Sequence, residues 1–193
     1  MGAMKLNGIV TFSIALLLMV SLEGSASGNS NSYVRDACSV TQYQALCIKS
    51  LASFSRVAKN SPSKWARAGV SVTITESKSV ARYLYRLSKS KHIRGRNRVA
   101  VFDCIECFGD AIDLLHRSLG ILRKLSARNF DAQMSDLTTW LSAALTDTDT
   151  CLDGFEGQTK SRYLKLLRIK TLNATYITSN ALALVNKLAT TGL

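Results

Sequence analysis

Apolar residues recur at alternating intervals of three and four positions along most of the chain, which is the spacing of one face of an α-helix. The longest such seam lies near the C-terminal end and predicts one long helix. Its members are Leu164, Leu167, Thr171, Ala174, Thr178, Ala181, Val185 and Leu188. Similar seams over residues 70–87, 101–122 and 130–151 predict three more helices. Four amphipathic helices with short connections favour an all-α fold, an antiparallel up-and-down four-helix bundle.

The segments that flank the predicted helices carry start and stop signals. Asn129 stands directly before the seam over 130–151, where its side chain is expected to cap the first turn of the helix. Gly154 and Gly157 follow the same helix and are expected to end it. The stretch from Lys89 to Arg98 is strongly basic, and we expect it to form an exposed loop between two helices.

The first 27 residues have the layout of a secretory signal peptide, with Lys5, an apolar run over 9–22 and small residues at 24–27. The apolar run is shorter than the roughly 20 residues of a membrane-spanning helix, so we expect cleavage and no stable membrane insertion. Residues 28–193 then form one secreted, extracellular domain. Cys38 and Cys47 lie among apolar residues, which fits a crosslinked helical hairpin over 33–66 ahead of the bundle at 67–193.

The chain contains five cysteines: Cys38, Cys47, Cys104, Cys107 and Cys151. In an exported protein this number favours two disulfides and one free thiol, and the sequence alone leaves fifteen such arrangements open. The spacing Cys104-x-x-Cys107 also allows a redox pair or, with Cys151 and His116, half of a zinc site. Both cysteines lie in the middle of a predicted helix, whereas redox pairs usually lie at a helix start. We therefore expect a structural role and no metal or cofactor.

The formal net charge is +12, and removal of residues 1–27 leaves it unchanged because one Lys and one Glu are lost. Residues 33–98 hold fourteen Lys or Arg against Asp36 and Glu76, whereas residues 99–193 hold ten charges of each sign. For an exported protein, a basic half of this kind indicates attraction to acidic polysaccharides or membrane surfaces rather than to nucleic acid. A role in solubility alone is the alternative.

Candidates for catalysis are few, because the chain has only two histidines, His92 and His116, and neither lies in a recognisable motif. His92 falls in the basic stretch, and His116 lies off the apolar stripes of its helix. No glycine-rich phosphate loop is present. The sequence therefore indicates a protein that is not an enzyme.

Glu106, Asp110 and Asp113 lie at i, i+4 and i+7 and form an acidic line along one predicted helix. Like charges at this spacing repel each other by a few tenths of a kcal/mol per pair, so the line calls for an explanation. It either meets a partner with basic groups or pairs internally with Arg117 or with basic residues of another helix.

Asn173-Ala174-Thr175 satisfies the N-glycosylation pattern, which makes Asn173 a candidate for modification. The motif lies inside the last predicted helix. Ala174 also belongs to the apolar seam of that helix, so use of the site stays open.

Several segments together resemble one known family, the plant invertase and pectin methylesterase inhibitors, and the resemblance covers essentially the whole mature chain. These segments are the Cys38-x8-Cys47 hairpin, Phe102-Asp103-Cys104 with 108–112, residues 136–145, residues 149–155 and residues 179–184. The resemblance implies a four-helix bundle behind an N-terminal hairpin. It also implies disulfides Cys38–Cys47 and Cys104–Cys151, with Cys107 as the unpaired thiol.

Members of this family block pectin methylesterases or acid invertases by filling the active-site cleft with one face of the bundle. Invertase inhibitors carry a Pro-Lys-Phe element in the loop where this chain reads Ala127-Arg128-Asn129-Phe130-Asp131-Ala132, and the run over 139–145 resembles the esterase branch. The resemblance therefore implies a one-to-one complex with pectin methylesterase in the apoplast. The contact positions that it implies are Glu106, Asp110, Asp113, Thr150 and Asp153. Inhibition of acid invertase, and a basic wall-binding protein that holds acidic pectin without an enzyme target, are the alternatives.

Overall fold

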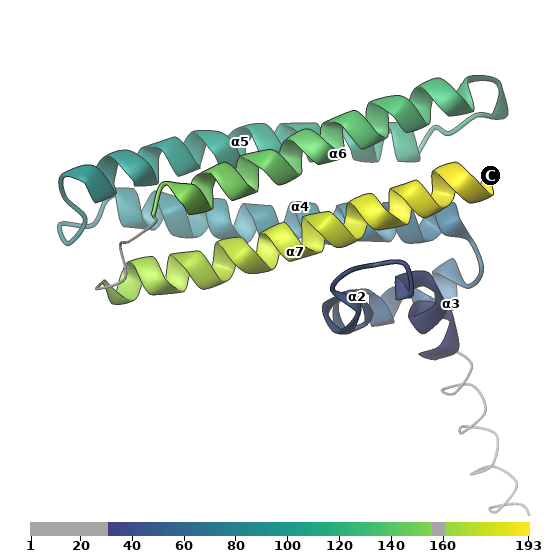
Figure 1. Ribbon diagram of the computed structural model, residues 1–193, viewed down its shortest axis with the longest axis horizontal. Helices are drawn as coiled ribbons and strands as arrows, with labels where there is room; N and C mark the ends of the chain where they lie inside the picture. The colour runs from purple at the N-terminus through teal and green to yellow at the C-terminus, as the bar shows by residue number, and fades with distance from the viewer. Residues whose placement is uncertain (1–30, 156–160) are drawn as a thin grey trace, which may run out of the picture.

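The computed structural model describes residues 31–155 and 161–193, so the expected signal peptide at 1–27 lies outside the described residues. Four long helices form an antiparallel bundle (Figure 1). They are α4 (Pro62–Ser88), α5 (Arg96–Leu122), α6 (Phe130–Asp153) and α7 (Arg162–Thr191). α4 packs against α5 and α7, and α6 packs against the same two helices. The predicted fold class is confirmed, and the α4–α7 pair lies opposite the α5–α6 pair.

The buried positions follow the seams that the sequence predicts. All eight seam residues of α7, from Leu164 to Leu188, are buried. In α6, Met134, Leu137, Leu141, Ala144, Thr148 and Cys151 are buried, while Phe130 is half-buried. The hydroxyl of Thr175 on α7 donates a hydrogen bond of 3.0 Å to that of Thr148 on α6, so buried polar groups on the seams also join neighbouring helices.

The helix boundaries differ from the expected ones in two places. α4 begins at Pro62, with the Ser61 hydroxyl accepting from the Lys64 N–H, so residues 62–66 belong to a bundle helix and not to the hairpin region. Of the basic stretch, only residues 89–95 form a connection, which is anchored by the buried Ile93, and Arg96–Arg98 lie in the first turn of α5.

The cap before α6 also differs from the expected one. Asn129 occupies the N-cap position, but its side chain makes no capping hydrogen bond. Gln133 satisfies the connecting backbone instead: its side-chain oxygen accepts from the Ser126 N–H at 3.0 Å, and its amide donates to the Lys124 carbonyl at 3.1 Å. The longer side chain of Gln133, one turn into the helix, therefore satisfies backbone groups of the connection that the Asn129 side chain does not reach.

The N-terminal segment lies beside the end of the bundle where α4 begins and α7 ends (Figure 1). It consists of a helix over 31–38, then α2 (Gln44–Leu51), a 3-10 turn (Ala52–Phe54) and the short helix α3 (Ser55–Ala58). A disulfide joins Cys38 to Cys47. The segment is thus a disulfide-linked set of short helices ahead of the bundle, as expected.

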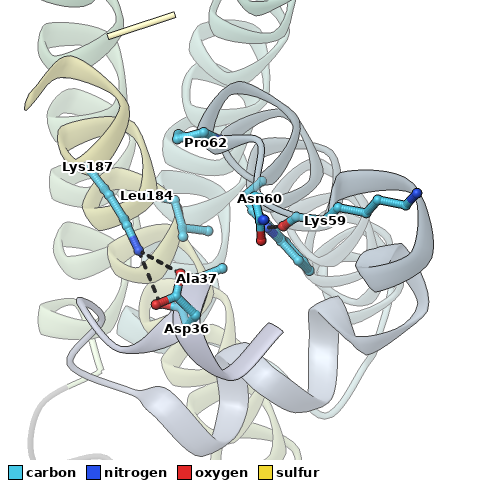
Figure 2. Close-up of a pocket in the computed structure, with 8 residues that line it drawn as sticks. Asp36, Ala37, Lys59, Asn60, Pro62, Leu184 and Lys187 are labelled. Carbon is cyan, nitrogen blue, oxygen red and sulfur yellow. Dashed lines mark hydrogen bonds and ion pairs between the residues drawn. The ribbon is translucent and has the colours of Figure 1, made fainter. Parts of the chain in front are cut away.

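Polar contacts fix the N-terminal segment to α7. The Lys187 ammonium donates to the backbone carbonyl of Asp36 at 3.2 Å and pairs with its carboxylate at 3.4 Å (Figure 2). The buried Asn180 side chain accepts from the Tyr43 N–H and donates to the Tyr43 carbonyl. Because these bonds join residues far apart in the chain, they set the position of the segment on the bundle.

Candidate partner-binding face

The acidic line predicted on α5 is present and exposed. Glu106, Asp110 and Asp113 all lie on the solvent side of the helix, opposite the buried residues Cys104, Phe108, Ala111 and Leu115. Asp103 precedes Glu106 by three positions and extends the line by one turn. Asp103 was not predicted as a member of the line, although the same 3-4-3 spacing identifies it.

The neighbouring helix α6 contains five Asp and no Lys or Arg. Its two predicted site residues, Thr150 and Asp153, are both exposed near its C-terminal end. The Thr150 hydroxyl donates to the Thr146 carbonyl at 2.9 Å, so its oxygen remains able to accept a hydrogen bond from a partner. A disulfide between Cys104 and Cys151 ties this end of α6 to α5.

Electrostatic coupling joins the acidic residues of the two helices. Burial raises the pKa of the Asp147 carboxyl on α6, and the Asp110 carboxylate on α5 raises it further. Burial likewise raises the pKa of Asp149, with Asp153 as the second cause. We call Asp103, Glu106, Asp110, Asp113, Asp147, Thr150 and Asp153 the acidic face. Asp147 was not predicted from the sequence, because its half-buried position depends on how α6 is rotated against α5.

The carboxylates of the acidic face have no cationic partner in the described chain. Among residues 31–155 and 161–193, the one ion pair is that between Lys187 and Asp36. The alternative of internal pairing with Arg117 or with another helix is therefore not realised there. The acidic face therefore keeps its charge repulsion, a few tenths of a kcal/mol per neighbouring pair.

Cys107 is the unpaired cysteine and lies half-buried beside this face. Burial raises the pKa of its thiol, and the carboxylates of Asp147, Asp110 and Asp103 raise it further. Cys104 is bonded to Cys151, so the Cys104-x-x-Cys107 spacing does not form a redox pair. A raised pKa keeps the thiol protonated and poorly reactive at neutral pH.

The remaining candidates lie apart from the acidic face. His116 is exposed on α5, and the exposed His92 ring stacks on Tyr163 with 5.8 Å between ring centroids. Asn173 is half-buried on α7, where its amide donates to the Glu76 carboxylate on α4 at 3.1 Å. A glycan on Asn173 would be attached to the same nitrogen, next to Glu76. None of the helices in the described ranges is long and apolar enough to cross a membrane.

Four antiparallel helices behind a disulfide-linked set of short helices, with a second disulfide inside the bundle, define a class of small disulfide-braced helical proteins. Comparison with known sequences gives the particular family. The chain belongs to the plant invertase/pectin methylesterase inhibitor family, whose sequence model matches residues 32–184.

Individual relatives agree with this assignment. Pectinesterase inhibitor 6 of Arabidopsis thaliana is 50% identical over 164 residues, which are 84% of this chain and 78% of that protein. A 21 kDa protein of Daucus carota is 34% identical over 176 residues, 89% of this chain and 91% of the relative. A crystal structure of a pectin methylesterase inhibitor from Arabidopsis thaliana matches 81% of this chain and 96% of its own, with a TM-score of 0.59 at 19% identity. This structural likeness supports the fold alone.

Proposed function

We propose that this protein is a secreted inhibitor of pectin methylesterase that acts in the apoplast. It binds the enzyme one to one and inserts the acidic face into the active-site cleft. The observation that carries this proposal is the unpaired line of carboxylates on α5, beside a helix, α6, that has five Asp and no Lys or Arg. The family and the name of the relative at 50% identity support the choice of target.

The charge of the face suits the substrate of such an enzyme. Pectin methylesterase hydrolyses the methyl esters of a galacturonan chain and leaves carboxylates, so its cleft has to hold a product that is a polyanion. Carboxylates of Glu106, Asp110 and Asp113 would occupy the positions of the polymer's own acidic groups, with the Thr150 hydroxyl oxygen as an uncharged acceptor beside them. Inhibition then needs no chemistry from the inhibitor, only occupation of the cleft.

Rigidity makes the face effective. The Cys104–Cys151 disulfide joins the two helices that carry it, close to Thr150 and Asp153. Phe108, Leu115, Leu137 and Leu141 are fully buried on the inner sides of α5 and α6, so neither helix can rotate without breaking the core. A face that is ordered before binding loses little conformational entropy in the complex, which favours tight association.

Titration of the purified protein against a plant pectin methylesterase tests the proposal. We expect activity to fall to zero at close to one inhibitor per enzyme, with a one-to-one complex in size-exclusion chromatography. A parallel titration of an acid invertase serves as the control and should leave sucrose hydrolysis unchanged. Inhibition of the invertase alone would assign the other target of this family. Loss of neither activity would leave a wall-binding protein without an enzyme target.

A further inference from the structure

The helix pair opposite the acidic face is strongly basic. α4 and α7 together carry ten Lys or Arg and one carboxylate, Glu76, whereas α5 and α6 carry nine Asp or Glu and three Arg. Figure 1 shows α4 and α7 side by side, across the bundle from α5 and α6. A charge count by position in the sequence does not show this division, because the basic helix α7 lies within residues 99–193, where positive and negative charges are equal in number. The fold therefore sorts charge by helix pair, with opposite signs on opposite sides.

Three cations of the α4–α7 pair converge on two tyrosines. The Arg86 guanidinium and the Lys170 ammonium each lie 5.9 Å from the centroid of the Tyr83 ring. The Arg162 guanidinium lies 5.6 Å from the centroid of the Tyr163 ring. The Tyr83 hydroxyl donates to the Tyr163 carbonyl at 3.1 Å, which fixes the two aromatic residues relative to each other. We call Arg86, Arg162, Lys170, Tyr83 and Tyr163 the basic cluster.

No carboxylate of the described residues neutralises the basic cluster. The one ion pair in those ranges lies elsewhere, at Asp36. Glu76, the single acid of these two helices, accepts a hydrogen bond from Asn173 instead. The His92 ring, which stacks on Tyr163, adds a third element, the connection between α4 and α5, to the surroundings of the cluster. Cations held together without a counter-charge form a local field that attracts a polyanion.

We propose that the basic cluster binds a polyuronate chain, the acidic form of a wall polysaccharide. A polyuronate repeats a carboxylate on every sugar ring, and it can therefore meet Arg86, Arg162 and Lys170 with successive residues. The exposed His92 ring, stacked on Tyr163 beside the cations, offers a flat face on which a pyranose ring can stack, while the buried Tyr83 ring holds Arg86 and Lys170 in place. This inference goes beyond the proposed function and is independent of it, since the acidic face lies on the opposite helix pair.

An anionic lipid surface is the competing partner, because Leu166 and Ile169 on α7 are exposed beside these cations. Surface-bound helices use Lys and Arg together with apolar side chains that enter the lipid. In the basic cluster, however, the groups between the cations are aromatic rings held by a hydrogen bond, and an ordered set of this kind suits discrete carboxylates. Binding measurements with polygalacturonate and with anionic vesicles separate the two partners.

The test compares two triple variants that each remove three positive charges. The first, Arg86→Gln, Arg162→Gln and Lys170→Gln, removes the charges of the basic cluster. The matched control, Arg123→Gln, Lys124→Gln and Arg128→Gln, changes exposed residues at the opposite end of the bundle. Calorimetric titration with de-esterified polygalacturonate should give about tenfold weaker binding for the first variant and less than about twofold for the control. Fully methyl-esterified pectin, which lacks the carboxylates, should bind neither the two variants nor the parent protein.

Two results would overturn the proposal. Equal losses in both variants would mean that polygalacturonate responds only to net charge. The second is loss of binding by the first variant to phosphatidylcholine vesicles that contain phosphatidylserine, with unchanged binding to polygalacturonate. That result would assign the surface to lipid. Inhibition of pectin methylesterase, measured on the same variants as initial rates with fully methyl-esterified pectin, to which the basic cluster does not bind, reports the acidic face separately, so failure of one proposal is distinguishable from failure of the other.

Discussion

Asn173 on α7 donates a hydrogen bond of 3.1 Å to the carboxylate of Glu76 on α4. Both side chains are half-buried, and Glu76 is the single acidic residue of the two helices. The bond therefore joins neighbouring helices of the bundle and satisfies a carboxylate that is otherwise surrounded by basic sequence. It also involves the asparagine of the Asn173-Ala174-Thr175 motif, and the donating nitrogen is the atom to which a glycan would be attached.

Replacement of Asn173 by Ala should lower the free energy of unfolding by about 1 kcal/mol, because the half-buried Glu76 carboxylate loses its donor. Urea unfolding followed by circular dichroism measures this change. Asn129→Ala is the matched control, since the Asn129 side chain makes no capping bond, and it should change the free energy by less than about 0.5 kcal/mol. Equal effects of the two substitutions would show that the bond contributes nothing.

The charge of the acidic face should control inhibition. Asp110→Asn combined with Asp113→Asn removes two central carboxylates at constant side-chain size, and we expect the inhibition constant for pectin methylesterase to rise about tenfold. The salt dependence of inhibition should fall as well, because fewer charges remain to be screened. The control, Asp131→Asn with Asp136→Asn, removes two exposed charges nearer the start of α6 and should change the constant less than about twofold. An unchanged constant for the first pair would remove these carboxylates from the interface.

The fold followed from the sequence because the burial seams are local patterns. The seam from Leu164 to Leu188 alone identified α7, and every member proved to be buried. The residue that caps the start of α6 could not be predicted in the same way, because Asn129 and Gln133 both have side chains able to bond the backbone. Which of them succeeds depends on the path of the connection from Lys124 to Phe130, and that path is a tertiary property.

The candidate site was predictable only in part. Glu106, Asp110 and Asp113 were identified by helical spacing, whereas Asp147 joins them through the packing of α6 on α5. The division of charge was hidden for a similar reason. Lys170 and Arg86 are far apart in sequence, yet both lie beside the Tyr83 ring because α7 packs against α4. Contacts between helices are set by rotation and crossing, which single-helix patterns do not contain.

The two disulfides should differ in their contribution to stability. In the loop-entropy model, closure of the Cys104–Cys151 loop stabilises the fold by about 4 kcal/mol and closure of Cys38–Cys47 by about 3 kcal/mol, because their sequence separations are 47 and 9. Double Cys→Ala variants of each pair, made in a Cys107→Ser background to prevent reshuffling, allow the comparison by urea unfolding. Loss of the Cys38–Cys47 bond should cost less, and the reverse order would contradict the loop-length argument.

Protonation of two carboxyls of α6, Asp147 and Asp149, should stabilise the folded protein at acid pH. Burial, with neighbouring carboxylates as the second cause, raises the pKa values of Asp147 and Asp149 above the ordinary value of 3.8, so the folded state binds protons more readily than the unfolded state. The stability that comes from this tighter proton binding is fully present below pH 3.8. It is lost as the pH rises through the raised pKa values of the folded state.

Asp147→Asn with Asp149→Asn should therefore stabilise the protein at pH 7 by about 0.5 kcal/mol, a figure that allows for solvent screening of these partly exposed groups. Below pH 3.8 the carboxyls are protonated in both states, and the difference from the parent protein should shrink toward zero. Unfolding midpoints in urea at the two pH values measure this. A stabilisation of equal size at both would show that the effect does not come from charge.

The same coupling should be visible in the reactivity of Cys107. Since the thiolate is the nucleophile, the raised pKa of the thiol should make alkylation by iodoacetamide slower than that of free cysteine at pH 7. Burial is the first cause of the shift and the Asp147 carboxylate the second, so Asp147→Asn should lower the pKa and speed alkylation roughly twofold at constant pH. Asp149→Asn removes a carboxylate that does not act on Cys107 and should leave the rate unchanged. Equal acceleration in both variants would mean that the thiol responds to loosening of α6 rather than to the charge of Asp147.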